Sequence, residues 1–143
     1  MDVKIKLVEE GGKALGMMPV FKTSGSACAD SFARLAKRKF VWLKPVLVPL
    51  GICLELPCNT EAIVRGRSGN GRKGLYVVHG TIDEDYRGEV SACVWSILPR
   101  FVKPGERIAQ IAVRRIPKIF FEPCKTLSET VRGAGGFGST GRF

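Results

Sequence analysis

The feature that most constrains the fold of this chain is a succession of short apolar segments, each followed by glycine or proline. The segments are rich in Val, Ile and aromatic residues, which favours strands bounded by turns. The expected strands cover residues 3–7, 46–48, 52–56, 62–64, 75–78, 90–98, 107–113 and 118–121. No segment carries a sustained helical stripe, and residues 31–39 are the best position for a short helix. The pattern predicts an all-β protein, a jelly-roll-like sandwich or barrel of short strands.

The size and charge of the chain limit the partners that it can have. Its 143 residues are enough for one domain with its own core. The net charge of +10 favours, or at least tolerates, a polyanionic partner, and much of the excess lies in Arg34–Lys39 and Arg114–Lys118. No stripe of interleaved aromatic residues accompanies these clusters, although a protein that binds single strands normally has one. A solvated basic face is therefore favoured, and nucleic-acid binding stays an open alternative.

The cysteines and the single histidine exclude several kinds of site. The five cysteines are widely spaced and form no C-x-x-C pair, so we expect reduced, mostly buried thiols rather than disulfides or a zinc site. His79 is the only histidine, which excludes a multi-histidine metal cage. No apolar run is long enough to cross a bilayer, and no signal-peptide core is present. We expect an intracellular protein, in the cytoplasm or nucleus, with no membrane partner.

Two stretches in the middle of the chain carry the polar residues of greatest interest. Residues 75–90 predict a hairpin with an acidic tip at Asp83, and Gly88 is expected at a positive φ. Acidic residues are common at turns because their side chains bond their own backbone, so the tip alone does not indicate a site. Just upstream, Arg67 and Ser68 lie between glycines, where a backbone can approach an anion.

The sequence ends on a glycine-rich arm, RGAGGFGSTGRF, from Arg132 to Phe143. Glycine-rich ends usually stay mobile because ordering them costs much backbone entropy. The glycine spacing imitates the opening of a Walker loop, but Ser139 stands where that motif needs lysine. A P-loop NTPase is therefore excluded.

Five short motifs follow one another along the chain. They are SACAD (26–30), GRSG (66–69), GTIDEDYRG (80–88), GERIAQ (105–110) and RGAGGFGSTG (132–141). In this order and at this approximate spacing, the set resembles the five motifs of the trimeric dUTPase family, over nearly the whole chain. The third and fifth motifs are long and specific, the fourth is moderately so, and the first carries little by itself.

The resemblance implies a homotrimer that hydrolyses dUTP to dUMP and pyrophosphate by attack of water on the α-phosphorus. The reaction would limit uracil entry into DNA and supply dUMP for thymidylate synthesis, with Mg²⁺ bound mainly through the substrate triphosphate. Asp83 would orient and deprotonate the attacking water, a role that typically contributes about 10²–10⁴-fold. Gln110 would bond a phosphate oxygen or the catalytic water.

The resemblance also implies the residues that hold the substrate, at sites between subunits. The ring of Tyr86 would lie under the deoxyribose and exclude a 2′-hydroxyl, and Asp30 would support the metal indirectly, through water. Uracil would be read by the backbone of Gly80, Thr81 and Ile82, and the phosphates would be held by Arg67, Ser68 and Gly69. In the arm, the implied substrate-binding residues are Arg132, Phe137, Gly138, Ser139 and Thr140, with Phe137 stacked over the uracil. We expect a β domain over residues 1–131 and a mobile arm over 132–143 that closes a neighbouring subunit's site.

The chain departs from the family at a few positions, and two alternatives to this function remain. Cys28 and Ser31 replace a usual glycine and leucine, and Asn70-Gly71 replaces a common Leu-Ala. None of these changes removes a chemical group from the implied mechanism. One alternative is a catalytically lapsed member that acts as an interaction module, although such a copy should have lost motif residues. The other is a nucleotide deaminase of the same fold type, although the third and fifth motifs favour pyrophosphate release.

Overall fold

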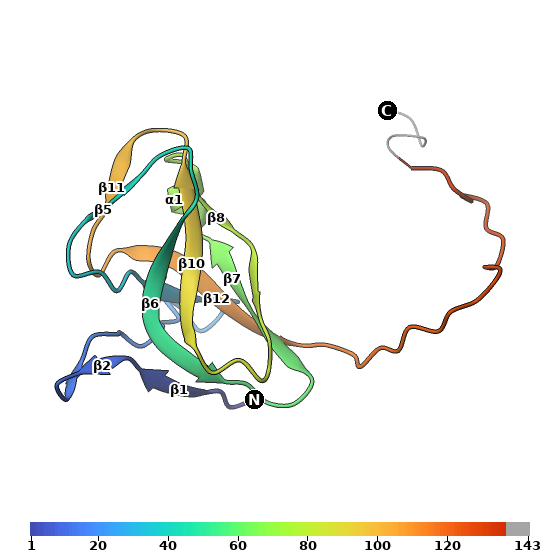
Figure 1. Ribbon diagram of the computed structural model, residues 1–143, viewed down its shortest axis with the longest axis horizontal. Helices are drawn as coiled ribbons and strands as arrows, with labels where there is room; N and C mark the ends of the chain where they lie inside the picture. Colours follow the sequence, from blue (N-terminus) through green and yellow to red (C-terminus); the bar gives the residue numbers. More distant parts are fainter. Residues whose placement is uncertain (137–143) are drawn as a thin grey trace.

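The structure is a computed structural model that describes residues 1–136, and two four-stranded antiparallel sheets form its body (Figure 1). The first sheet has the strand order β1-β6-β10-β8. Its strands are Lys4–Leu7, Val46–Glu55, Glu89–Ser96 and Leu75–Val78. The second sheet has the order β4-β12-β7-β9. Its strands are Ala29–Phe32, Arg107–Arg115, Thr60–Gly66 and Gly80–Ile82. The expectation of an all-β protein is confirmed.

Smaller elements complete the described part of the chain. Strands β5 (Lys39–Val41) and β11 (Arg100–Val102) pair with each other, and so do β2 (Glu9–Glu10) and β3 (Lys13–Ala14). A single short helix, α1, covers Ser68–Gly71 within residues 1–136. In that part of the chain no helix is long and apolar enough to cross a membrane.

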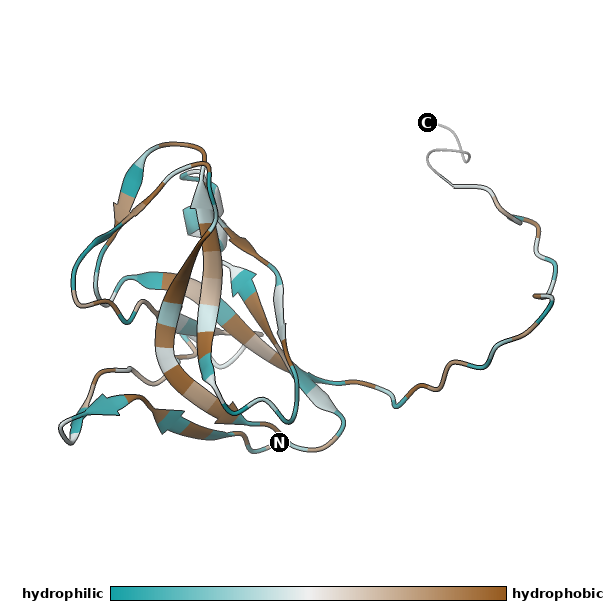
Figure 2. Ribbon diagram, in the orientation of Figure 1, coloured by the Kyte–Doolittle hydropathy of each residue, from teal (hydrophilic) through white to brown (hydrophobic). Residues whose placement is uncertain are grey.

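The hydrophobic core lies between the two sheets. Strand β10 alternates strictly between buried and half-buried positions, and its buried residues include Val90, Ala92 and Val94. Strand β6 contributes Val48, and the opposing strand β7 contributes Val64. Period-two alternation is expected where one face of each sheet meets the core, and Figure 2 shows it as changing colour along the strands. The sandwich holds the loops and strand ends at fixed positions.

The two expected strands at 46–48 and 52–56 are one continuous strand, β6. Gly51 takes a φ of +72°, and the pairing of β10 with β6 shifts register between Glu89 and Ser91. Pro49 lies inside the strand, although it has no N–H to donate. Because β1 pairs only with residues 52–55, β6 has no ladder on that side at Pro49. A proline is therefore tolerated there.

The helix expected at 31–39 is wrong. Ser31 and Phe32 belong to β4, where Ser31 pairs with Ala109 of β12, and Lys39 begins β5. A distant strand thus decides the conformation of a segment whose local signal was weak. The strand expected at 118–121 is also absent, because this segment leaves the domain after β12 with Phe120 and Phe121 almost fully exposed.

The cysteines are free, as expected, but the expectation that most are buried is wrong. Cys58 and Cys124 are exposed, and Cys28, Cys53 and Cys93 are half-buried. Cys53 and Cys93 lie on sheet positions whose side chains alternate with buried neighbours. The apolar character of cysteine predicts buried thiols. The register of the strands instead places the side chains of Cys53 and Cys93 at half-buried positions.

Candidate active site

The first group of predicted site residues gathers around the buried carboxylate of Asp30. Asp30 lies in β4 directly opposite Gln110 of β12, whose Nε2 donates to Oδ1 at 3.0 Å. Arg67, just after β7, donates from Nε to Oδ1 at 2.9 Å and from Nη2 to Oδ2 at 3.2 Å. Arg107, at the start of β12, donates from Nη1 to Oδ2 at 3.2 Å. Adjacent strands thus bring three separate motifs to one carboxylate.

These contacts keep Asp30 ionised although its side chain is only 2% exposed. Burial by itself raises the pKa of Asp30, because it disfavours the charged form. The hydrogen bonds from Gln110, Arg67 and Arg107, together with the charge of Arg67, outweigh burial, so the pKa lies below its ordinary value. In return, Asp30 fixes the direction of two guanidinium groups.

The loop after β7 presents two further predicted residues beside this cluster. Ser68 and Gly69 are exposed in the single turn of α1. Asn70 is buried, and its Nδ2 donates to the carbonyl oxygens of Arg107 at 3.1 Å and Ile108 at 3.3 Å. Asn70 departs from the family pattern, yet here it ties the loop to β12. The loop therefore keeps a fixed position relative to Gln110.

A small cavity opens beside the carboxylate of Asp30. Its volume is about 230 Å³, and its lining includes Asp30, Gln110 and Cys28 from two of the motifs. Lys22 also lines it, although sequence reasoning did not select this residue. The signal for Lys22 was weak, since it is a single lysine in an otherwise unremarkable loop. Its side chain adds a positive charge to the lining, which otherwise carries the single charge of Asp30.

The second group of predicted residues lies around the edge strand β9, which pairs only with β7. A cavity of about 390 Å³ adjoins this strand. Its lining includes Gly80, Thr81, Ile82, Asp83, Tyr86, Glu89, His79 and Leu47. An edge strand presents a row of unpaired N–H and C=O groups. The cavity therefore offers backbone donors and acceptors to a planar polar ligand.

Asp83 follows β9 and is exposed at this cavity. Its carboxylate forms no hydrogen bond or ion pair with any residue between 1 and 136. The turn is closed by its backbone, because the N–H of Tyr86 donates to the carbonyl oxygen of Asp83 at 3.2 Å. The carboxylate is thus fixed at its base and open at its tip, as a proton acceptor needs to be.

Gly88 is not at a positive φ, so the expected reason for this glycine is wrong. A Cβ added at Gly88 would lie 2.4 Å from the hydroxyl oxygen of Tyr86 and 2.6 Å from its Cζ. The hydroxyl of Tyr86 in turn donates to the carbonyl oxygen of Glu89 at 3.2 Å. A side chain at position 88 would therefore displace the ring of Tyr86, which packs across the backbone at Gly88.

Two further residues support this hairpin, and sequence reasoning missed both. Nε and Nη2 of Arg34 donate to the two carboxylate oxygens of Glu89 at 2.6 and 2.7 Å. The backbone N–H of Gly51 donates to Glu89 Oε1 at 2.8 Å. The hydrogen bond from Arg34 is the largest cause of the lowered pKa of Glu89. This half-buried ion pair holds the register shift at the start of β10, next to Tyr86.

The two groups remain separate, and Arg132, the one predicted arm residue within the described part of the chain, joins neither. The Asp30 cavity and the Asp83 cavity share no lining residue. Arg132 lies in the extended segment beyond β12, where its Nε donates to the carbonyl oxygen of Gly135 at 2.8 Å. Figure 1 shows this segment running away from the sheets. Phe137, Gly138, Ser139 and Thr140 lie outside the described residues.

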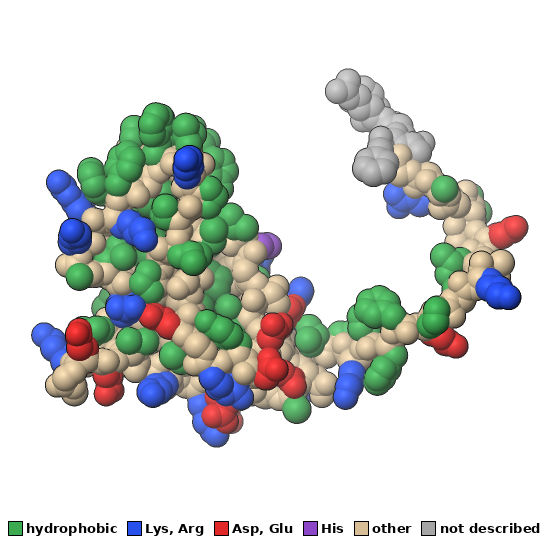
Figure 3. All heavy atoms as spheres, in the orientation of Figure 1, with side chains coloured by type: hydrophobic (Ala, Val, Ile, Leu, Met, Phe, Trp, Pro, Cys, Tyr) green, Lys and Arg blue, Asp and Glu red, His purple; other side chains and the backbone are tan. Residues whose placement is uncertain are grey.

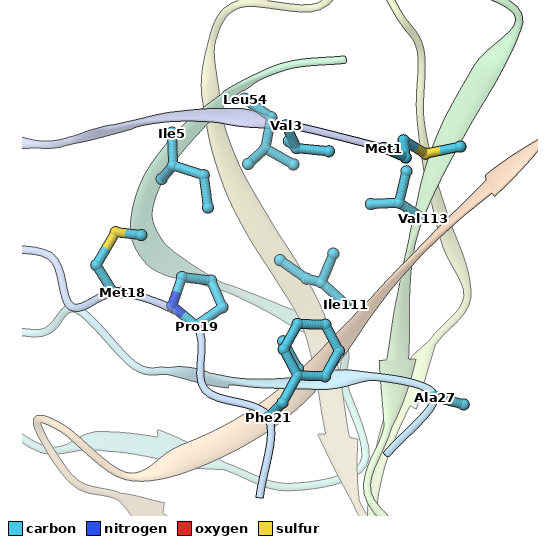
Figure 4. Close-up of a pocket in the computed structure, with 11 residues that line it drawn as sticks. Met1, Val3, Ile5, Met18, Pro19, Phe21, Ala27, Leu54, Ile111 and Val113 are labelled. Carbon is cyan, nitrogen blue, oxygen red and sulfur yellow. The ribbon is translucent and has the colours of Figure 1, made fainter. Parts of the chain in front are cut away.

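A third cavity, of about 430 Å³, is lined almost entirely by apolar side chains (Figure 4). It is bordered by Val3 and Ile5 from the N-terminal strand, Leu54 from β6, and Ile111 and Val113 from β12. No titratable side chain lines it. It is therefore suited to apolar side chains rather than to the chemistry of a charged substrate.

The described residues contain no cluster that would hold a metal ion directly. No group of three His, Cys, Asp or Glu side chains lies close enough together between residues 1 and 136. Asp30 already accepts four hydrogen bonds, so its oxygens have no open position for direct coordination.

Comparison with known proteins shows the family and the fold of the chain. The dUTPase family model matches residues 17–141. The deoxyuridine 5′-triphosphate nucleotidohydrolase of Corynebacterium diphtheriae is 41% identical over 133 residues, which are 87% of this chain and 85% of that protein. The structure of the Staphylococcus bacteriophage 80alpha dUTPase with dUPNHPP covers 99% of both chains, at a TM-score of 0.86 and 19% identity.

A second solved structure is that of a mutant dUTPase from phage phi11 of S. aureus, described with a structural Mg(II) ion. It matches 88% of this chain and 98% of its own, with a TM-score of 0.77 and 15% identity, which shows the same fold. The family model and the bacterial relative each cover most of the chain. This chain belongs to the dUTPase family.

Proposed function

We propose that this protein hydrolyses dUTP to dUMP and pyrophosphate, which is supported by its 41% identity to a deoxyuridine 5′-triphosphate nucleotidohydrolase. The observation that carries the proposal is the exposed carboxylate of Asp83 at a cavity lined by an edge strand. Such a cavity offers a backbone that can pair with a planar base and, beside it, an acceptor for a proton from water.

Asp83 would accept a proton from a water molecule as the water oxygen attacks the α-phosphorus. The bond from that phosphorus to the bridging oxygen then breaks, and pyrophosphate leaves. The unpaired edge of Gly80–Ile82 would read uracil, because its donors and acceptors alternate as the base requires. The ring of Tyr86, held against Gly88, would border the sugar and leave no room for a 2′-hydroxyl.

The Asp30 cluster would supply the phosphate-binding part of the site. The backbone of Ser68 and Gly69 is exposed there, and Arg67 is already oriented by Asp30. Gln110 would donate to a phosphate oxygen or to the attacking water. Magnesium, when bound through the triphosphate, would neutralise charge that the arginines do not reach. Asp30 would act on the metal only through water.

A homotrimer with sites between subunits would bring the two groups together. Within one copy they line separate cavities, so base and phosphates of one substrate would contact different copies. Exposed Phe120, Phe121 and Leu127 in the segment beyond β12 have no cover in a single copy. The apolar cavity of Figure 4 would accept such side chains from a neighbour. The arm from Arg132 onward would then reach and close a neighbouring site.

A substrate panel tests the proposed reaction. Purified protein with magnesium is given dUTP, UTP, dCTP and dTTP, and the monophosphate, pyrophosphate and deaminated products are quantified. We expect dUMP and pyrophosphate from dUTP alone. A deaminated product from dCTP would support the deaminase alternative. A folded oligomer that converts none of the four would be the lapsed interaction module, which the intact Asp83 and Gln110 disfavour.

Deleting residues 132–143 tests the role of the arm. The shortened protein should keep its oligomeric state in analytical ultracentrifugation and lose dUTP turnover, because the terminal phosphates lose their cover. Full turnover by the shortened protein would contradict a closing arm.

A further inference from the structure

The small sheet of β5 and β11 carries exposed aromatic rings that the two main sheets do not use. Phe40 of β5 pairs directly with Phe101 of β11. Their neighbours Val41 and Val102 are fully buried, so alternation turns Phe40 and Phe101 to the outer face, where they are 50% and 44% exposed. Their ring centroids lie 5.4 Å apart, edge to face. Trp42, two residues beyond Phe40, is also exposed.

Positive charges flank these rings. The guanidinium carbon of Arg38 lies 4.3 Å above the ring centre of Phe101. Lys103 directly follows β11 and is exposed. We call Arg38, Phe40, Trp42, Phe101 and Lys103 the aromatic–cationic face. Figure 3 shows Lys and Arg side chains among apolar ones at this end of the molecule.

The charges of this face are not compensated locally. Neither Arg38 nor Lys103 forms an ion pair with any residue between 1 and 136. No acidic residue occurs at positions 31–54 or 90–105, whereas Lys37 and Lys44 add two exposed cations. Glu106, the acidic residue nearest in sequence, is paired with Arg100. The aromatic–cationic face is therefore positively charged, as the net charge of the whole chain is, at +10.

We propose that the aromatic–cationic face binds single-stranded nucleic acid, with bases stacked on Phe40 and Trp42, and phosphates held by Lys103 and by Arg38, whose guanidinium lies on the ring of Phe101. Stacking platforms between cations are how proteins bind single strands without sequence preference. A duplex hides its base faces, so exposed rings favour an unpaired strand. A second copy of this chain carries the same excess of positive charge, which makes it a poorer partner than a polyanion. This site is independent of the proposed hydrolysis, because it shares no residue with either polar cavity.

The test measures binding of labelled oligo(dA) and oligo(A) strands of about 20 nucleotides to the full chain by fluorescence anisotropy. Adenine strands avoid any pocket for uracil. Affinity should fall steeply between about 50 and 200 mM salt. A duplex of equal length should bind at least severalfold more weakly than the single strand. A non-hydrolysable dUTP analogue should leave binding of the strand unchanged.

Paired variants locate the binding surface. Arg38→Gln with Lys103→Gln should lower the magnitude of the salt slope by roughly 1.4, which is about 0.7 for each of two lost phosphate contacts. Phe40→Leu and Trp42→Leu, which remove a ring and keep an apolar side chain, should each weaken binding by about fivefold or more. The control, Lys6→Gln with Lys13→Gln, removes two charges from β1 and β3 and should change the slope little. All variants should turn over dUTP as the parent does, which shows that they fold.

Several outcomes would overturn the proposal. They are equal binding of duplex and single strand, equal losses in the control variant, and competition by the dUTP analogue. Binding to phosphatidylserine vesicles but to neither strand would also overturn it, because a lipid surface offers charge without bases to stack.

Discussion

Asp30 and Asp83 are both predicted site carboxylates, yet the structure gives them opposite surroundings. Asp30 is buried and accepts four hydrogen bonds from Arg67, Arg107 and Gln110. Asp83 is exposed, and no side chain between residues 1 and 136 contacts its carboxylate by a hydrogen bond. A carboxylate whose acceptor positions are filled orients its partners, whereas an open one can take a proton. The same residue type is thus suited to two different purposes in the two groups.

The ion pairs of the Asp30 group and of the Asp83 group also differ in where they lie relative to the proposed substrate. In the Asp30 group, the charges themselves would face substrate phosphates. In the Asp83 group, the ion pair of Arg34 with Glu89 lies behind the hairpin and holds its base. In the Asp30 group, the same residues would support the site and bind the substrate. In the Asp83 group, different residues have these two roles. Substitution of the carboxylate should affect stability in the first and turnover in the second.

The largest expected effect follows Asp83→Asn, which keeps the shape of the side chain and removes the proton acceptor. Turnover of dUTP should fall by about 10²–10⁴-fold, while a non-hydrolysable analogue should bind with nearly unchanged affinity. Asp85→Asn, in the same exposed turn, is the matched control and should retain turnover. Equal losses in both variants would remove Asp83 as the base and would indicate a general need for negative charge in the turn.

Asp30→Asn should act mainly on stability. Removing this charge leaves the partly exposed Arg67 and Arg107 without their shared partner, and hydrogen bonds to a charged group contribute about 1.5–3 kcal/mol. Chemical denaturation at fixed protein concentration should show a clear loss. Glu55→Gln breaks the exposed pair with Lys4 and should change stability far less. Similar results for both variants would show that Asp30 is not a structural anchor.

Acid should weaken the fold through Asp30 and Glu89, whose pKa values both lie below their ordinary values. A carboxyl with a lowered pKa in the folded state stabilises fully above its ordinary value, and the contribution fades as pH falls through the lowered one. The free energy of unfolding should therefore decrease below the ordinary Glu pKa of 4.5. Glu89→Gln should flatten this decrease, which denaturation curves at several pH values would reveal. An unchanged pH profile in that variant would assign the acid sensitivity elsewhere.

The smallest expected effect concerns Ser31, one of the departures from the family pattern. Its hydroxyl is buried and has no hydrogen-bond partner among the described residues. Ser31→Ala should therefore raise stability by about 1 kcal/mol. Ser96→Ala is the opposite case, because the buried hydroxyl of Ser96 donates to the carbonyl oxygen of Gly74 at 3.0 Å. That variant should lose about 1 kcal/mol. A loss in both variants would mean that Ser31 has a partner in the assembled protein.

Much of this arrangement could be predicted from sequence because it depends on local pattern. Alternation of apolar residues located β8 and most of β10, and the motif order identified the family before any contact was known. The errors came where distant pairing outweighs local preference. Within residues 31–39, Ser31 and Phe32 pair with β12 and Lys39 pairs with β11, and the residues between them form a loop. The sequence predicts a positive φ at Gly88, which the structure does not have. A side chain at this position would instead meet the ring of Tyr86, a contact that the sequence does not reveal.

The sequence by itself determined the fold class, the family and the choice of Asp83 as the proposed reactive carboxylate. These properties depend on the types, spacing and order of the residues, so they can be predicted without a structure. Only the tertiary structure decided that Asp30 is saturated and Asp83 is open, since both are aspartates in short polar motifs. It also decided that Phe40 and Phe101 share a face with Arg38, because this pairing joins strands about sixty residues apart. Contacts between distant segments follow from sheet register, and register is set by the packing of the whole core.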